Sequence, residues 1–265
     1  MMLLGGLGGA LLLVAQPLPA QGDAPPEAMA AFQFAPPVDR PMTYRVTTRR
    51  IGRDGSLINV SLIYALRWQR IGRGYQLRSV LQRIDSDDPP AVTRALTLIL
   101  QPLVGEELAY LVAPDGSHID LVDPDGLWER ATARVETTGA AGDRAEAKQL
   151  AQLIAALPPL ERDRLATADA RALVAAANDA IAAAAAADGA SVSILHGGTL
   201  RTVAKVEQDS ATGDGAPPLQ IDHLCTVDSA TGLVMQERRQ SWIVDAQSGG
   251  RTLVEERVRA IEPAS

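Results

Sequence analysis

Two Pro-Asp-Gly tripeptides form an acidic stretch that could hold a cation. They occupy residues 114–116 and 124–126, and Asp120 and Asp123 lie between them. Calcium takes about six or more oxygen ligands, and two separate turns would not converge on one ion. Proline presets a turn and glycine accepts positive φ, so the first copy predicts a hairpin turn. The second copy, next to Asp123, predicts the start of a helix.

His223 and Cys225 are two residues apart on a predicted strand, so their side chains share one face. The pair could form half of a metal site, or a nucleophile with its base. A metal site needs three or four ligands, and neither His118 nor His196 has ligand spacing around it. The other side chains of that face are apolar. This favours a buried thiol beside a hydrogen-bonded histidine, and we expect no metal site.

A second acidic group consists of Asp85, Asp87 and Asp88, directly before two prolines. It fits a calcium site or the N-terminus of a helix, and the helix dipole favours the second interpretation. The chain contains no Gly-x-Ser-x-Gly sequence and no glycine-rich phosphate loop. We therefore expect a non-enzymatic protein without a cofactor. An undetected hydrolase is the remote alternative.

The composition of the 265 residues is that of a globular protein, with 46% hydrophobic and 22% charged residues. The net charge of -7 contains no block of like charge, which argues against nucleic acid as a partner. Cys225 is the only cysteine, so no intramolecular disulfide can form.

Residues 1–20 predict a secretory signal peptide, although no lysine or arginine precedes the apolar run Leu3–Ala15. A membrane span needs about 20 apolar residues, so this run is too short for one. No cysteine directly follows the run, so we expect a periplasmic protein that is not a lipoprotein. Residues 21–41, rich in alanine and proline, predict a partly disordered leader. Phe32 and Phe34 could dock on the domain that follows.

Residues 42–265 predict a single α+β domain that opens with three long antiparallel strands joined by tight turns. The clearest strand covers residues 57–70, where apolar and polar side chains alternate except at Ile63 and Ala65. Six side chains on one face are Ile58, Val60, Leu62, Tyr64, Leu66 and Trp68. That face is either plain core or the lining of a ligand cavity.

Helices are predicted in the middle of the chain. One covers residues 90–103, and a helical insert covers about residues 124–188. The insert contains helices at residues 144–157 and 168–187, and Thr167 is the expected cap of the second. The chain then returns to four or five strands. A long sheet with one apolar face needs a cover, and these helices are available to provide it.

The long strand, the helical insert and the hairpin VDSATGLVMQERR resemble the periplasmic half-barrels of the lipoprotein-localisation-factor type. The likeness covers about residues 42 to 262. It implies an α+β fold in which a long, curved antiparallel sheet packs around a group of helices, with acyl chains bound between the two. It assigns a role to no single residue.

These observations predict a secreted periplasmic protein that binds a lipid-like ligand or an envelope component. The alternative is an envelope protein-interaction or structural module with a solid core. We expect neither a nucleic-acid partner nor a membrane span after signal cleavage. The candidate ligand-binding residues are Ile58, Val60, Leu62, Tyr64, Leu66, Trp68 and Trp128. Arginines that could face lipid headgroups or an acidic partner, or simply be solvated, are Arg45, Arg49, Arg50, Arg53, Arg67, Arg70 and Arg73.

Overall fold

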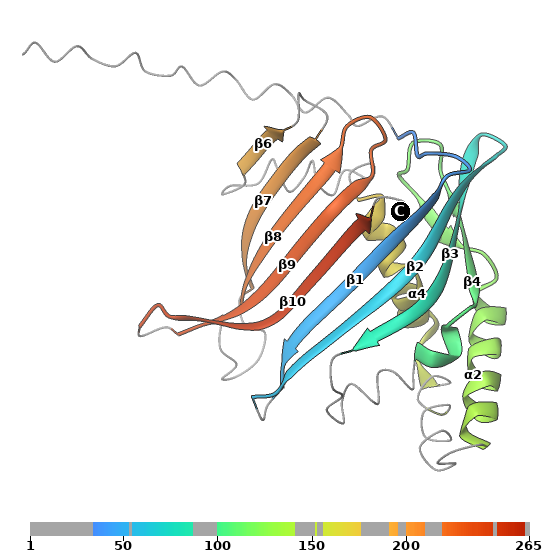
Figure 1. The fold of residues 1–265 in the computed structure, drawn as a ribbon, viewed down its shortest axis with the longest axis horizontal. Coiled ribbons are helices and arrows are strands. Elements are labelled where there is room, and N and C mark those ends of the chain that lie inside the picture. The colour runs from blue at the N-terminus through green and yellow to red at the C-terminus, as the bar shows by residue number, and fades with distance from the viewer. Residues whose placement is uncertain are drawn as a thin grey trace, which may run out of the picture. The chain divides into compact units, whose positions relative to one another are not determined.

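One large antiparallel sheet dominates the computed structural model of the chain (Figure 1). The chain divides into two units, Met1–Ala30 and Ala31–Ser265. The structure describes residues 34–52, 55–86, 100–140, 152, 156–175, 191–195, 200–209, 219–245 and 248–262. The predicted signal peptide lies outside these residues. The elements are β1 (Pro41–Ile51), β2 (Leu57–Ile71), β3 (Gly74–Ser86), η1 (Gln101–Leu103), β4 (Glu107–Val112), β5 (Ile119–Leu121), α2 (Pro124–Ala140), α4 (Pro159–Leu173), β6 (Ser191–Leu195), β7 (Leu200–Asp209), β8 (Leu219–Asp228), β9 (Val234–Val244) and β10 (Arg251–Glu262).

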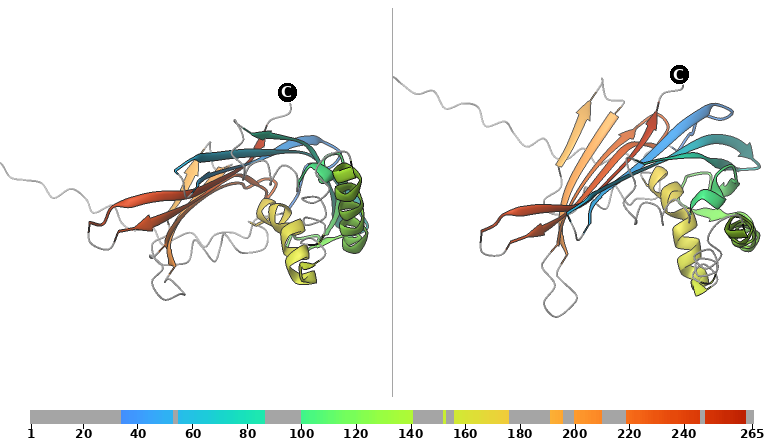
Figure 2. Two further views of the ribbon diagram at one scale, coloured as in Figure 1. Left: turned by 90° about the horizontal axis from the view of Figure 1, so that it is seen from below. Right: turned by 60° about the horizontal axis from the view of Figure 1, so that its bottom comes forward.

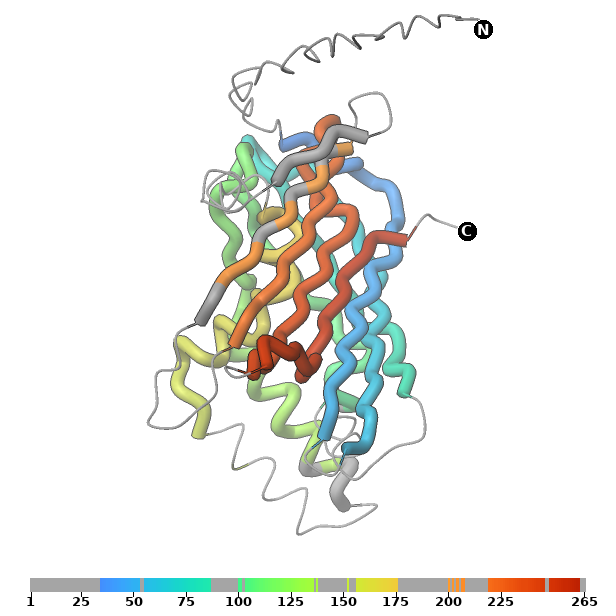
Figure 3. The backbone as a smooth tube through the Cα atoms, turned by 90° about the vertical axis from the view of Figure 1, so that its left-hand side faces the viewer, coloured from blue at the N-terminus to red at the C-terminus, as the bar shows by residue number. Residues whose placement is uncertain are grey.

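The ten described strands lie in the order β5-β4-β3-β2-β1-β10-β9-β8-β7-β6. Neighbouring strands pair antiparallel throughout, and the first and last strands of the chain meet in the middle of the sheet (Figure 3). The sheet is open and half-barrel-like: it curves, and α4 lies on its concave side (Figure 2). Helix α2 stands beside β4 at one margin of the curve.

The predicted alternation of residues 57–70 is confirmed by the pairing of β2. Tyr64 lies directly opposite Tyr44, and Leu62 opposite Val46. Side chains directly opposite each other in an antiparallel pair project from the same face, and Tyr44 reaches α4 from the concave face. The six apolar side chains predicted to share a face therefore all lie on the concave side of the sheet.

The concave side of β1 to β5 packs against the helices to form the main hydrophobic core. Trp68, Leu77 and Leu173 are almost fully buried there. Phe34 makes edge-on ring contacts with Trp68 at 5.6 Å and with Tyr75 at 5.4 Å between ring centroids. Phe34 therefore docks as expected, and the chain from residue 34 onward, the last part of the predicted leader, is ordered on the domain. Phe32 lies outside the described residues.

The predicted boundary of the second insert helix is wrong. Helix α4 begins at Pro159, not after Thr167, because proline fits the first turn of a helix, where its missing N–H is not needed. Thr167 is buried within the helix, and its hydroxyl donates a hydrogen bond to the carbonyl of Asp163 at 2.7 Å. The other predicted helices, residues 144–157 and 90–103, lie almost entirely outside the described residues, as does the alanine-rich stretch after 175.

The first Pro-Asp-Gly copy forms a turn and the second starts a helix, as the sequence predicts. In the first, Gly116 has a φ of 75°, and hydrogen bonds from Ser117 lower the pKa of Asp115. In the second, α2 begins at Pro124, and the carboxylate of Asp123 accepts a hydrogen bond from the backbone N–H of Gly126 at 3.1 Å. Asp123 therefore caps the helix.

Replacing the cap, Asp123→Ala, is expected to lower the free energy of unfolding by about 1 kcal/mol, because one N–H of the first turn then loses its acceptor. Thermal or urea unfolding measures this loss. The neighbouring Asp125→Ala is the matched control, since it removes a first-turn acid and leaves the cap in place. If both variants lost the same free energy of unfolding, the negative charge near the start of the helix, and not the capping hydrogen bond, would be the source of the stability.

Candidate functional site

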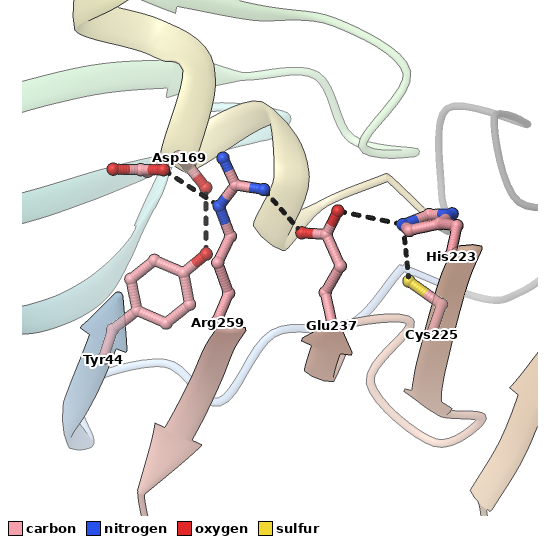
Figure 4. A network of polar contacts seen from close by, with 6 residues as sticks. All are labelled: Tyr44, Asp169, His223, Cys225, Glu237 and Arg259. Atoms are coloured by element: carbon pink, nitrogen blue, oxygen red, sulfur yellow. Dashed lines mark hydrogen bonds and ion pairs between the residues drawn. The ribbon is translucent and has the colours of Figure 1, made fainter. Parts of the chain in front are cut away.

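Six residues form a chain of polar contacts on the concave side of the sheet (Figure 4). We call them the polar network. They come from β1, α4, β8, β9 and β10 and are Tyr44, Asp169, His223, Cys225, Glu237 and Arg259. The strand register sets most of this arrangement, since Arg259 lies opposite Glu237, and Glu237 lies opposite Cys225.

Arg259 joins the sheet to α4 at the centre of the polar network. Its Nε donates a hydrogen bond to the carboxylate of Asp169 at 2.9 Å, and its Nη1 donates to Glu237 at 2.8 Å. The side chains of Arg259 and Glu237 are only 10% and 11% exposed. Burial disfavours the guanidinium charge, but the two carboxylates outweigh it and raise the pKa of Arg259. The arginine is thus a permanent cation between two anions.

Glu237 has the most strongly lowered acidic pKa among the described residues. Burial alone would raise it, but the hydrogen bond from His223 and the charge of Arg259 lower it to about 2. An ionised carboxylate can only accept hydrogen bonds. The contact of 2.9 Å between Glu237 and the Nε2 atom of His223 therefore requires a proton on Nε2.

Tyrosines of the concave face hold the main chain of α4. The hydroxyl of Tyr110 donates to the carbonyl of Ala166 at 2.8 Å, and that of Tyr44 donates to the carbonyl of Asp169 at 3.4 Å. Burial, and next the charge of Asp169, raise the pKa of both tyrosines and of Tyr64, so all three stay neutral donors. The helix is held on the sheet by directed hydrogen bonds as well as by apolar packing.

Cys225 and His223 are brought together, but not as a nucleophile and its base. The thiol lies 4.0 Å from the same Nε2 atom that carries the proton donated to Glu237 (Figure 4). That nitrogen has no lone pair to take a proton from the thiol. Burial and the charge of Glu237 raise the pKa of Cys225 to about 12. The residue is the buried core thiol that the sequence favours.

The thiol of Cys225 is expected to resist alkylation in the native protein at neutral pH and to react stoichiometrically once the chain is unfolded in urea. A thiolate is the reactive form, and both burial and the raised pKa suppress it. Mass spectrometry after iodoacetamide treatment measures the labelled fraction. Rapid labelling of folded protein would contradict the assignment of Cys225 to the core.

No protein-family model matches this chain, and no curated protein matches it. Among the helices that the structure describes, none is both long and apolar enough to cross a bilayer.

The acidic residues before the two prolines do not start a helix at Asp85. Asp85 lies in β3, because the strand continues to Ser86, and it forms ion pairs with Arg83 at 3.2 Å and Arg45 at 3.7 Å. Asp87 and Asp88 are outside the described residues. Within the described part of the chain, no group of three or more potential ligands could hold a metal ion.

The arginines of the first hairpins do not form one cluster. Because side chains alternate along a strand, Arg45 and Arg49 lie on the convex face, where they pair with Glu262 and Glu256. Arg70, in contrast, donates a hydrogen bond to the hydroxyl of Tyr75 at 2.7 Å. Arg50, Arg67 and Arg73 are exposed, and Arg53 lies outside the described residues.

The candidate ligand-binding residues lie on or near the core. On β2, four of them are buried, and Leu62 and Tyr64 are partly buried. Trp68 is 0% exposed and contacts Phe34, so a ligand can reach it only by displacing protein side chains. Trp128 is half-buried on α2, and its indole N–H has no hydrogen-bond partner among the described residues. The buried β2 residues are Ile58, Val60, Leu66 and Trp68.

Sequence reasoning did not select Asp169, Glu237 or Arg259. Their positions in the sequence look like those of solvated charges, and Asp169 is 90 residues from Arg259 along the chain. The one available signal is the predicted inward face of His223 and Cys225. The neighbouring strands of the sheet place some of their own side chains on this inward face. A charged side chain that is buried there needs a partner of opposite charge.

Proposed function

We propose that the chain is a secreted, periplasmic, non-enzymatic protein that binds a lipid-like ligand between a half-barrel sheet and its inserted helices. The observation that carries the proposal is the division of the concave face. On β1 to β5 this face is largely apolar and aromatic, whereas on β8 to β10 it carries the polar network. Helix α4 contacts side chains from both halves.

This division suits an amphiphilic ligand. The hydrogen bonds from Tyr44, Tyr110 and Arg259 fix the main chain and Asp169 of α4 at defined points. Apolar packing beside those points is non-directional, which suits an acyl chain as a packing partner. The resemblance to periplasmic half-barrels, which take acyl chains between sheet and helices, supports the same function.

Native mass spectrometry of the purified protein after incubation with bacterial lipid extract tests the proposal. We expect a lipid adduct of defined stoichiometry that is lost in Leu62→Asp, which places a charge on the concave face. The matched control is Leu111→Asp on the exposed side of β4, which should keep the adduct. Absence of any adduct in the wild-type protein would refute lipid binding without recourse to a variant.

A protein-interaction module with a solid core is the second candidate function, and the outer surface of α4 favours it. Leu160 and Leu165 are 76% and 60% exposed there. A photo-crosslinker at Leu165 should then capture one dominant envelope protein, whereas one at exposed Leu57 on the sheet should not. Capture of a single protein together with the absence of bound lipid would favour this function over lipid binding.

A further inference from the structure

Four basic residues lie at one level of the sheet, on four adjacent strands. The register pairs Arg257 of β10 with Arg239 of β9, Arg239 with His223 of β8, and His223 with Lys205 of β7. We call these four positions the basic row. Residues directly opposite each other are about 5 Å apart and share a face. Arg257 is two residues from Arg259, so the row runs along the concave side, next to the polar network.

The two arginines of the basic row have no anionic partner in the part of the chain that the structure describes. Neither Arg257 nor Arg239 forms a hydrogen bond or ion pair with another described residue, and the Nε of Arg257 is shielded from solvent without an acceptor. Like charges placed opposite each other destabilise a sheet, and a buried donor without an acceptor costs about 1–3 kcal/mol. In contrast, Arg259, one step along the same strand face, has two carboxylate partners.

The acidic residues of the neighbouring rows do not neutralise the pair. Glu237 already accepts hydrogen bonds from Arg259 and His223. On the other side of the basic row, Glu255 lies opposite Arg50 of β1, and Glu207 of β7 lies opposite Ile221. Across the strands, Arg257 faces Thr48 and Arg239, and Arg239 faces Arg257 and His223. No acidic residue lies directly opposite either arginine, so both guanidinium groups are available to an external anion.

We propose that Arg257 and Arg239 bind the phosphate headgroup of an amphiphilic ligand. Arginine presents a planar fork of N–H donors that matches phosphate oxygens, and two guanidinium groups on adjacent strands can share one phosphate. On the other side of the basic row, Arg257 lies opposite Thr48 of β1, and Thr48 lies opposite Val60 of β2. A headgroup on the arginines thus places its tail toward the apolar half of the concave face. This inference rests on the proposed lipid-binding function and specifies the headgroup.

Calorimetric titration with two ligands of equal chain length, dodecyl phosphate and uncharged dodecyl maltoside, tests the site, with glycerol phosphate as a headgroup without a tail. We expect wild-type protein to bind dodecyl phosphate about tenfold more tightly than dodecyl maltoside. In the double variant Arg239→Gln, Arg257→Gln the two affinities should become equal. The matched control is Arg238→Gln, which removes an exposed arginine from the opposite face of β9 and should keep the preference.

Equal affinities for the two dodecyl ligands in wild-type protein, or a preference that survives in the double variant, would overturn the headgroup site but leave lipid binding intact. Glycerol phosphate binding as tightly as dodecyl phosphate would support the anion site and refute the lipid function. If the double variant does not fold, the salt dependence of the preference for dodecyl phosphate in wild-type protein tests the proposal instead. The Debye length falls from about 30 Å at 0.01 M to about 3 Å at 1 M salt, so the preference must shrink, and a salt-independent preference overturns the proposal.

Discussion

Replacing Arg259 with methionine is expected to lower the free energy of unfolding by about 3 kcal/mol at neutral pH. The substitution keeps the length of the side chain but removes the cation between Asp169 and Glu237. Glu237 is 11% exposed, so its carboxylate would then remain buried with His223 as its remaining partner. Urea unfolding followed by circular dichroism measures the loss.

Two further variants separate the polar network from a general effect of removing an arginine. Arg49→Met removes a cation that is 55% exposed, and its partner Glu256 keeps a hydrogen bond from Gln240. That loss should stay below about 1 kcal/mol. The triple variant Arg259→Met, Asp169→Asn, Glu237→Gln leaves no unpaired buried charge and should recover most of the stability. A loss in Arg259→Met no larger than that in Arg49→Met would show that the network adds nothing to stability.

The N-terminal half of the sheet is predictable from sequence because its signals are local. Apolar side chains recur at every second position from Ile58 to Trp68, and the first Pro-Asp-Gly copy and Gly72 set the chain direction within a few residues. The burial of Phe34 also follows from its type, since an aromatic side chain in a leader rich in alanine and proline has the most apolar surface to bury on the domain.

The C-terminal half resists the same reasoning because its inward face is charged. On β10, the concave side carries Arg257 and Arg259, while Val258 between them faces the other way. From the alternation of apolar and polar residues alone, Val258 would be predicted to lie on the concave side and the two arginines on the convex side. Register shifts near Leu253 and Thr226 further interrupt the period of two. Only the pairing with α4 and with β8, both distant in sequence, shows which charges are buried.

The start of α4 shows a related limit. Thr167 has the residue type of a helix cap, and the alanine-rich sequence after it favours a helix, so propensity alone places the boundary there. The helix begins nine residues earlier than predicted because Pro158 and Pro159 fit an N-terminus as well as an end. The earlier start is what places Ala166 and Asp169 opposite Tyr110 and Tyr44.

Acidification from pH 5 to pH 2 is expected to remove about 3 kcal/mol of stability through Glu237 alone. Its pKa is about 2 in the folded protein against an ordinary value of 4.5. Above pH 4.5 the carboxylate is ionised in both states, and the full stabilisation by Arg259 and His223 is present. As the pH falls from 4.5 to 2, the unfolded chain binds a proton that the folded protein excludes, so stability is lost over this window.

The comparison of wild-type protein with Glu237→Gln isolates this effect, because the variant has no proton to bind at that position. The difference in free energy of unfolding between the two proteins should shrink steadily from pH 5 to pH 2 and then level off. The carbon-13 shift of the Glu237 carboxyl, followed by NMR over the same range, should titrate near pH 2. A titration near pH 4.5 would mean that Arg259 and His223 do not hold this carboxylate in solution, and would contradict the buried ion pair between β9 and β10.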